Sequence, residues 1–106
     1  MITRETLDSI KPKVRTTPLD MTAEWGITVF VKCPTGEDEI ALRTTEDLMR
    51  HQICVGLCDE EGNCLYHYPE DVDALNKFPT IDLMKIFEAI NDCSTLRGKV
   101  NHAKKN

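Results

Sequence analysis

The 106-residue sequence has no long apolar run. No stretch approaches the roughly 20 consecutive apolar residues that a transmembrane helix needs. Residues 1–10 are mixed and polar, without the apolar centre of a secretory signal peptide. These absences disfavour a membrane-spanning or secreted protein, and we expect a cytoplasmic one.

The sequence also lacks the motifs of nucleotide binding and of common catalytic sites. It contains no G-x-x-x-x-G-K-S/T and no G-x-G-x-x-G pattern, and its five glycines are scattered. None of the three histidines, His51, His67 and His102, lies in a recognisable motif with a nucleophile or a paired carboxylate. We therefore predict a protein that is not an enzyme, with no catalytic residue and no cofactor.

Positive charge is in short supply. The sequence contains thirteen lysines and arginines and eighteen acidic residues, which gives a formal net charge of -5. An acidic chain is a poor ligand for nucleic acid or an anionic membrane, so we expect neither as a partner. The length indicates a single domain with a modest core.

Cysteine is more plentiful, with five residues, three of them in "CVGLCDEEGNCLYHYPEDV", residues 54–72. In a reducing compartment we expect free thiols. A Cys/Cys/Cys/His metal site can be drawn from Cys54, Cys58, Cys64 and His51, but the spacing is not that of zinc knuckles. The simpler interpretation is that Cys54 and Cys93 belong to the core, while Cys58 and Cys64 flank a turn at "DEEGN".

The pattern of residues predicts an α+β fold, with a small N-terminal β-hairpin followed by three to four helices in a single domain. "WGITVFVK" alternates as a strand with Trp25, Ile27, Val29 and Val31 on one face. Residues 14–17 are its expected hairpin partner, ended by Pro18. We expect a flexible arm at 1–12, the domain at 13–97 and a disordered basic tail at 98–106.

Four helices are predicted after the hairpin. The first covers 36–42 with Thr35 as its cap, the second lies within 43–57 with a capping box begun by Thr44, and the third covers 69–77. The last runs from an N-cap at Thr80 to about residue 96. Its expected buried face consists of Leu83, Ile86, Phe87, Ile90 and Cys93.

Trp25 is the only tryptophan and has two interpretations. On the apolar face of a strand it belongs to the core. At the beginning of a hairpin it is also a candidate partner-binding residue, because tryptophan is enriched at the centres of interfaces. The core interpretation is favoured.

Three stretches carry a resemblance to a known family. "AEWGITVFVKCPTGEDE" (23–39), "GLCDEEGNCLYHYPEDVDAL" (56–75) and "TIDLMKIFEAINDCSTL" (80–96) resemble, in this order, segments of phage tail assembly chaperones. The likeness covers roughly residues 10–97. Ile27 replaces a frequent second glycine, and "CP" replaces the usual apolar pair before Thr35.

The resemblance implies a non-enzymatic assembly factor of a long-tailed phage or prophage. Such chaperones bind the tape measure protein, which is long and largely apolar-helical, and help to recruit tail tube subunits in the host cytoplasm. A homo-oligomer is a further candidate assembly. The alternative is a small cytosolic regulatory or binding module with a Cys/His metal site.

Overall fold

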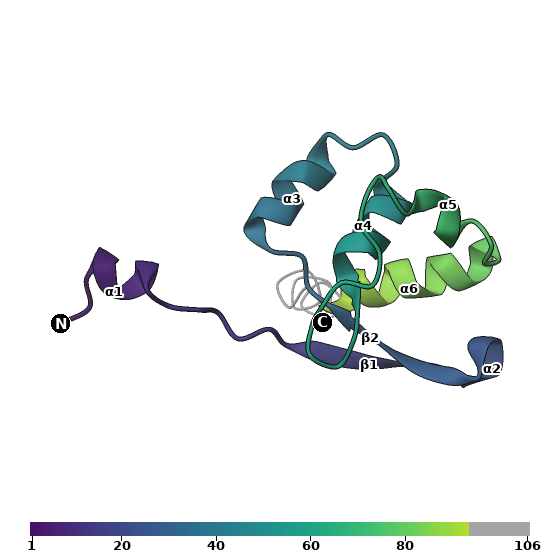
Figure 1. Ribbon diagram of the computed structural model, residues 1–106, viewed down its shortest axis with the longest axis horizontal. Helices are drawn as coiled ribbons and strands as arrows, with labels where there is room; N and C mark the ends of the chain where they lie inside the picture. Colours follow the sequence, from purple (N-terminus) through teal and green to yellow (C-terminus); the bar gives the residue numbers. More distant parts are fainter. Residues whose placement is uncertain (94–106) are drawn as a thin grey trace, which may run out of the picture.

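The computed structural model describes residues 1–93 of the chain, and Figure 1 shows its α+β architecture. A three-stranded antiparallel sheet is combined with six helices in this part of the chain, which confirms the predicted fold class. The predicted end of the last helix near residue 96 and the predicted tail at 98–106 lie outside the described residues.

The sheet contains the predicted hairpin, with different bounds. Strand β1 (Thr16–Met21) pairs antiparallel with β2 (Ile27–Lys32), and β2 pairs with the short β3 (Leu57–Cys58). The prediction that Pro18 ends the first strand is wrong, since Pro18 lies inside β1 opposite Phe30. The proline is tolerated because β1 is an edge strand, where an N–H group can be missing without loss of a ladder bond.

The start of "WGITVFVK" also differs from the expected alternation. Trp25 ends the short helix α2 (Thr22–Trp25), and Gly26, with φ of 74°, turns the chain into β2. This left-handed conformation interrupts the period of two, so Trp25 does not continue the face of the strand. Ile27 is 56% exposed at the end of the hairpin, and only Val29 and Val31 of the predicted set are buried strand residues.

The predicted loose arm contains one short helix. Helix α1 (Arg4–Asp8) is capped by the Thr3 side chain, which accepts from the Thr6 N–H at 3.2 Å. None of its residues is buried, and Figure 1 shows it set apart from the remaining helices. The helix therefore makes no contribution to the core.

Helices α3 and α4 follow the prediction, apart from one cap. Helix α3 (Gly36–Arg43) begins with a complete capping box between Thr35 and Asp38. Helix α4 (Leu48–Gly56) begins four residues after Thr44, the predicted cap. Asp47 caps it, accepting from the Arg50 N–H at 3.2 Å, and Leu57, predicted as helical, belongs to β3.

Helices α5 and α6 complete the described chain. Helix α5 (Val72–Leu75) is shorter than the predicted 69–77, because Asp71 closes a turn with His67 instead. The Asp71 N–H donates to the His67 carbonyl, and the His67 N–H donates to the Asp71 carboxylate. Helix α6 (Thr80–Cys93) begins at Thr80 itself, and the Pro79 carbonyl accepts from the Leu83 N–H at 3.2 Å. Thr80 is therefore the first helical residue rather than the cap.

The core lies where α4 and α6 pack on the sheet, as Figure 1 shows. Each fully buried aliphatic side chain stabilises the fold by about 1.5–3 kcal/mol. Of the predicted face of α6, Phe87 and Cys93 are only half-buried, since they lie at the margin of the α6 contact. The buried apolar residues are Met21, Val29, Val31, Ile53, Cys54, Leu57, Cys58, Leu75, Leu83, Ile86 and Ile90.

The predicted "DEEGN" turn is confirmed. The Asp59 carboxylate accepts from the backbone N–H groups of Glu61 and Asn63, both at 2.9 Å. Gly62 has φ of 92°, and a Cβ there would lie 2.3 Å from a methyl carbon of Val14. Only glycine therefore allows this turn to lie against the segment that leads into β1.

No helix within residues 1–93 combines the length and the apolar character that crossing a membrane requires.

Candidate functional site

The clearest candidate binding site is a groove of about 400 Å³ between α3, α4 and α6. Leu42 of α3, Leu48 of α4 and Phe87 of α6 provide its apolar surface, and the buried Ile90 of α6 lies beneath them. Glu39 and Arg43, one acidic and one basic, also line it from α3. We call this feature the apolar groove after its leucine and phenylalanine side chains, although the polar side chains of Gln52 and Asn91 also line it. Its volume is within the range of sites that accept small apolar groups or a few side chains of a partner.

The polar atoms beneath the apolar groove are already satisfied. The Gln52 amide is buried and donates to the Asn91 side-chain oxygen at 2.7 Å and to the Phe87 carbonyl at 3.3 Å. This pair joins α4 to α6 across the floor. A ligand in the groove therefore does not have to compensate an unpaired buried amide.

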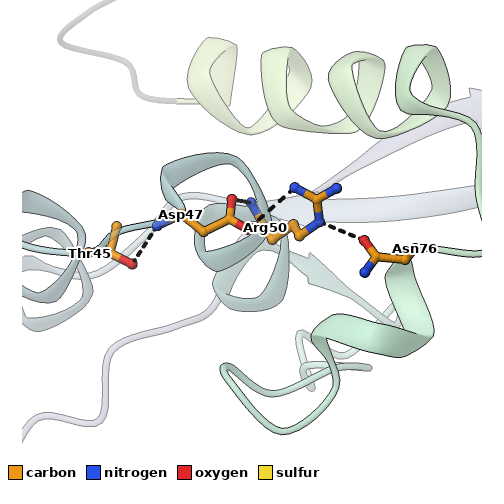
Figure 2. A network of polar contacts seen from close by, with 4 residues as sticks. All are labelled: Thr45, Asp47, Arg50 and Asn76. Atoms are coloured by element: carbon orange, nitrogen blue, oxygen red, sulfur yellow. Dashed lines mark hydrogen bonds and ion pairs between the residues drawn. The ribbon is translucent and has the colours of Figure 1, made fainter.

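A polar network fixes the beginning of α4 beside the apolar groove. Figure 2 shows Thr45, Asp47, Arg50 and Asn76 arranged in a row from the α3–α4 connection to the end of α5. Asp47 caps α4 and pairs with the Arg50 guanidinium at 3.3 Å, and the Arg50 Nε–H donates to the Asn76 oxygen at 2.8 Å. The network therefore holds α5 against α4.

A second hollow of about 370 Å³ lies against other residues of α4. His51 and Cys54 of α4 face it together with Asp38 of α3, and the segment 64–70 closes it. The His51 ring stacks on Tyr68 with centroids 4.0 Å apart and an angle of 8° between the rings. Its Nδ1 is buried and has no hydrogen-bond partner among the described residues.

Trp25, the sequence-based candidate for partner binding, already has partners within the fold. Its ring packs on Phe78 with centroids 4.4 Å apart, and its indole N–H donates to the Asp82 carboxylate at 3.0 Å. Close to this contact, Lys85 of α6 donates a hydrogen bond to the carboxylate of Glu24 in α2. The tryptophan therefore joins α2 to the beginning of α6, and it lines neither hollow.

Two cysteines and two histidines, Cys54, Cys64, His51 and His67, line the second hollow, but they are not arranged as metal ligands. No group of three or more His, Cys, Asp or Glu residues within 1–93 is arranged to hold a metal ion. Cys58 and Cys64 flank the turn as a bridge pair, but Cys58 is also buried. Burial, followed by the nearby Asp71 charge, raises the pKa of the Cys54 thiol to about 11. That thiol is protonated at neutral pH and is a poor nucleophile.

The residues of the apolar groove were not recognised as a site in the sequence. Leu48 and Phe87 belong to the predicted apolar faces of two helices, where burial is the default expectation. Leu48 is instead 48% exposed, and Phe87 is half-buried. The only signal in the sequence was an apolar face wider than a single helix contact needs.

Comparisons with known proteins give no relative for this chain. No family model, no curated protein and no solved structure matches it.

Proposed function

We propose that the protein is a non-enzymatic tail assembly chaperone of a long-tailed phage or prophage, acting in the host cytoplasm. In this proposal it binds apolar helices of the tape measure protein and helps to recruit tail tube subunits. The resemblance of three sequence segments supports the family. The observation that carries the binding activity is the apolar groove, formed by Leu42, Leu48, Phe87 and Ile90.

The position of the apolar groove between helices suits an amphipathic helix as its ligand. Such a helix presents apolar side chains at i, i+3, i+4 and i+7, and grooves between helices bind these side chains as anchors. Glu39 and Arg43 carry opposite charges, so a client helix with either sign along its polar edge finds a partner. We therefore expect the groove to recognise the spacing of apolar side chains along a client helix more than any particular sequence.

The size of the apolar groove favours reversible binding. A hollow of about 400 Å³ accepts few side chains, so each contact contributes modest affinity. Several copies along a long client would cover its apolar stretches and still leave when tube subunits compete. The net charge of -5 would help to keep such a complex in solution through mutual repulsion.

The test uses synthetic helical peptides from the tape measure protein of the same genome, with scrambled peptides of identical composition as controls. Binding is followed by fluorescence anisotropy with the full chain. We expect amphipathic peptides to bind and scrambled ones to bind at least about tenfold more weakly, a difference of about 1.4 kcal/mol. Equal binding of both peptide sets, or of neither, would contradict the proposal.

Two substitutions locate the site. Leu48→Glu places a charge in the apolar groove, whereas Met84→Glu places one on α6 outside it. The side chains are comparably exposed, at 48% and 47%, so both variants are expected to fold. We expect only Leu48→Glu to weaken peptide binding. An equal loss in both variants, with unchanged thermal unfolding, would place the binding surface elsewhere.

The chaperone activity has its own readout. The tape measure protein is expressed alone and together with the chain, and its soluble fraction is compared. We expect the chain to raise this fraction and the Leu48→Glu variant to raise it less. If the wild-type chain leaves the tape measure protein in the insoluble fraction, the assignment to tail assembly is wrong, whatever peptides bind in the groove.

A further inference from the structure

The second hollow beside α4 has a chemistry that the apolar groove lacks. It is lined by the aromatic rings of His51, Tyr66 and Tyr68 and by the carboxylates of Asp38 and Glu70. We call it the acidic pocket. Its volume of about 370 Å³ is close to that of the apolar groove, but its walls come from α3, α4 and the segment 64–70 instead of α6.

The acidic pocket has two carboxylates, and its basic side chains are the histidines His51 and His67. None of the lysines or arginines in residues 1–93 lines it. Arg50, the neighbour of His51 in sequence, is engaged by Asp47 and Asn76. Neither Asp38 nor Glu70 forms an ion pair with a lysine or arginine of residues 1–93, although the Asp38 carboxylate also accepts from the Thr35 N–H at 3.0 Å in the capping box of α3.

The pKa of the Cys54 thiol, which lines the acidic pocket, indicates the sign of the electrostatic field there. Burial is the main cause of the raised pKa of Cys54, and the charges of Asp71, Asp47 and Glu70 raise it further. Each of these charges disfavours a thiolate, so the field at this wall is negative. A cationic ligand is therefore favoured over an anionic one.

We propose that the acidic pocket binds the guanidinium group of an arginine presented by a partner protein. A guanidinium is planar, stacks on aromatic faces and pairs with carboxylates through donors in a fixed fork. It carries five N–H donors and no acceptor, which suits walls formed by carboxylates, phenol oxygens and a histidine ring. The compact ammonium of lysine lacks the planar stacking face.

This site is separate from the groove of the proposed function. Leu48 and Gln52 of α4 line the apolar groove, whereas His51, Cys54 and Val55 line the acidic pocket. A partner can occupy one without the other. The inference therefore does not depend on the identity of the helical client.

The test is a heteronuclear NMR titration of the full chain with Nα-acetyl-arginine amide. The matched probes are the citrulline analogue, which has nearly the same shape without charge, and the lysine analogue. We expect the arginine probe to shift backbone signals of residues 51–55 and 64–70. We expect the citrulline probe to bind at least about tenfold more weakly, because it lacks the charge that pairs with carboxylates.

A charge-neutral substitution tests the carboxylate. Glu70→Gln removes one charge from an exposed position of the pocket, and Glu88→Gln removes one from an exposed position of α6. We expect the first to weaken arginine binding several-fold and the second to leave it unchanged. Equal binding of arginine and citrulline, equal binding of the lysine probe, or an unchanged affinity in Glu70→Gln would each overturn the assignment.

Discussion

The apolar groove and the acidic pocket lie against the same helix and differ in almost every chemical respect. On one side of α4, Leu48 lies beside apolar side chains of α6, and Gln52 pairs with Asn91 of α6. Three positions on from Leu48, His51 lies among aromatic rings and carboxylates that form no ion pair within residues 1–93. The character of each hollow is therefore decided by the element that packs opposite α4.

This difference shows how a small chain can present two unlike surfaces without a second domain. Successive helical residues point about 100° apart, so a nine-residue helix such as α4 faces several neighbours. Helix α6 gives one side an apolar lining. The segment 64–70, which has no helix or strand of its own, gives the other side tyrosines and an acid.

The largest expected effect comes from breaking the contact between α4 and α6. Ile90 is fully buried and forms part of the floor of the apolar groove. We expect Ile90→Ala to lower the free energy of unfolding by about 2–5 kcal/mol, since it leaves a cavity. Urea unfolding measures this, with Ile81→Ala at a 75% exposed position as control. A loss near that of the control would show that α6 packs loosely on α4.

A smaller effect tests how closely the two helices approach. A Cβ on Gly56 would lie 2.5–2.9 Å from three side-chain carbons of Ile90. We expect Gly56→Ala to destabilise by about 1–3 kcal/mol, because overpacking outweighs the better helix propensity of alanine. Adding Ile90→Val removes one of the crowding carbons and should recover part of the loss. A stabilising Gly56→Ala would mean that Ile90 moves aside freely.

The third prediction tests the independence of the two hollows. Leu48→Glu should weaken helical peptide binding about tenfold, or about 1.4 kcal/mol, and leave arginine binding intact. Glu70→Gln should do the reverse. Both ligands are titrated against both variants in one buffer. If either substitution affects both ligands equally, the hollows act as one site and the contrast between them is wrong.

The smallest expected effect concerns acid stability away from both hollows. The backbone N–H of Asn63 is the main cause of a lowered pKa of Asp59, and other backbone groups of the turn add to it. A lowered pKa in the folded state stabilises the fold above the unfolded value of about 3.9, and this contribution is lost as the pH falls through the folded pKa.

Asp59→Asn should therefore reduce the loss of stability as the pH falls below about 4. An asparagine oxygen can still accept from the N–H groups of Glu61 and Asn63, so the turn is retained. Thermal unfolding across this pH range measures the effect, with Glu60→Gln as the control. If both variants follow the wild-type curve, the turn carboxylate has no share in acid unfolding.

Local periodicity was enough to predict the hairpin, the acidic turn and most of α3, α4 and α6. The errors arose where tertiary structure decides. Pro18 fits within a strand only because that strand is at the edge, and Asp71 closes a turn with His67 where a helix was expected. Asp47 and Thr44 were both acceptable caps by residue type, and only the observed hydrogen bond distinguishes them.

The two hollows could not be derived from the sequence because each joins distant segments. Leu42 and Phe87 both line the apolar groove, and Asp38 and Glu70 both line the acidic pocket. No local pattern states which apolar residue of a helical face remains half-exposed after assembly. Trp25 was the candidate for partner binding in the sequence, but its ring packs on Phe78 and its indole N–H donates to Asp82.

Pro18 at the free edge of the sheet has a kinetic consequence. An exposed edge strand is a template on which other extended chains can nucleate, and this route leads to aggregation. The proline removes one N–H from β1, and the other edge, β3, has only two residues. Both edges therefore recruit a further strand poorly. At high concentration, or beside a partly unfolded chain, the molecule should seed few fibrillar assemblies.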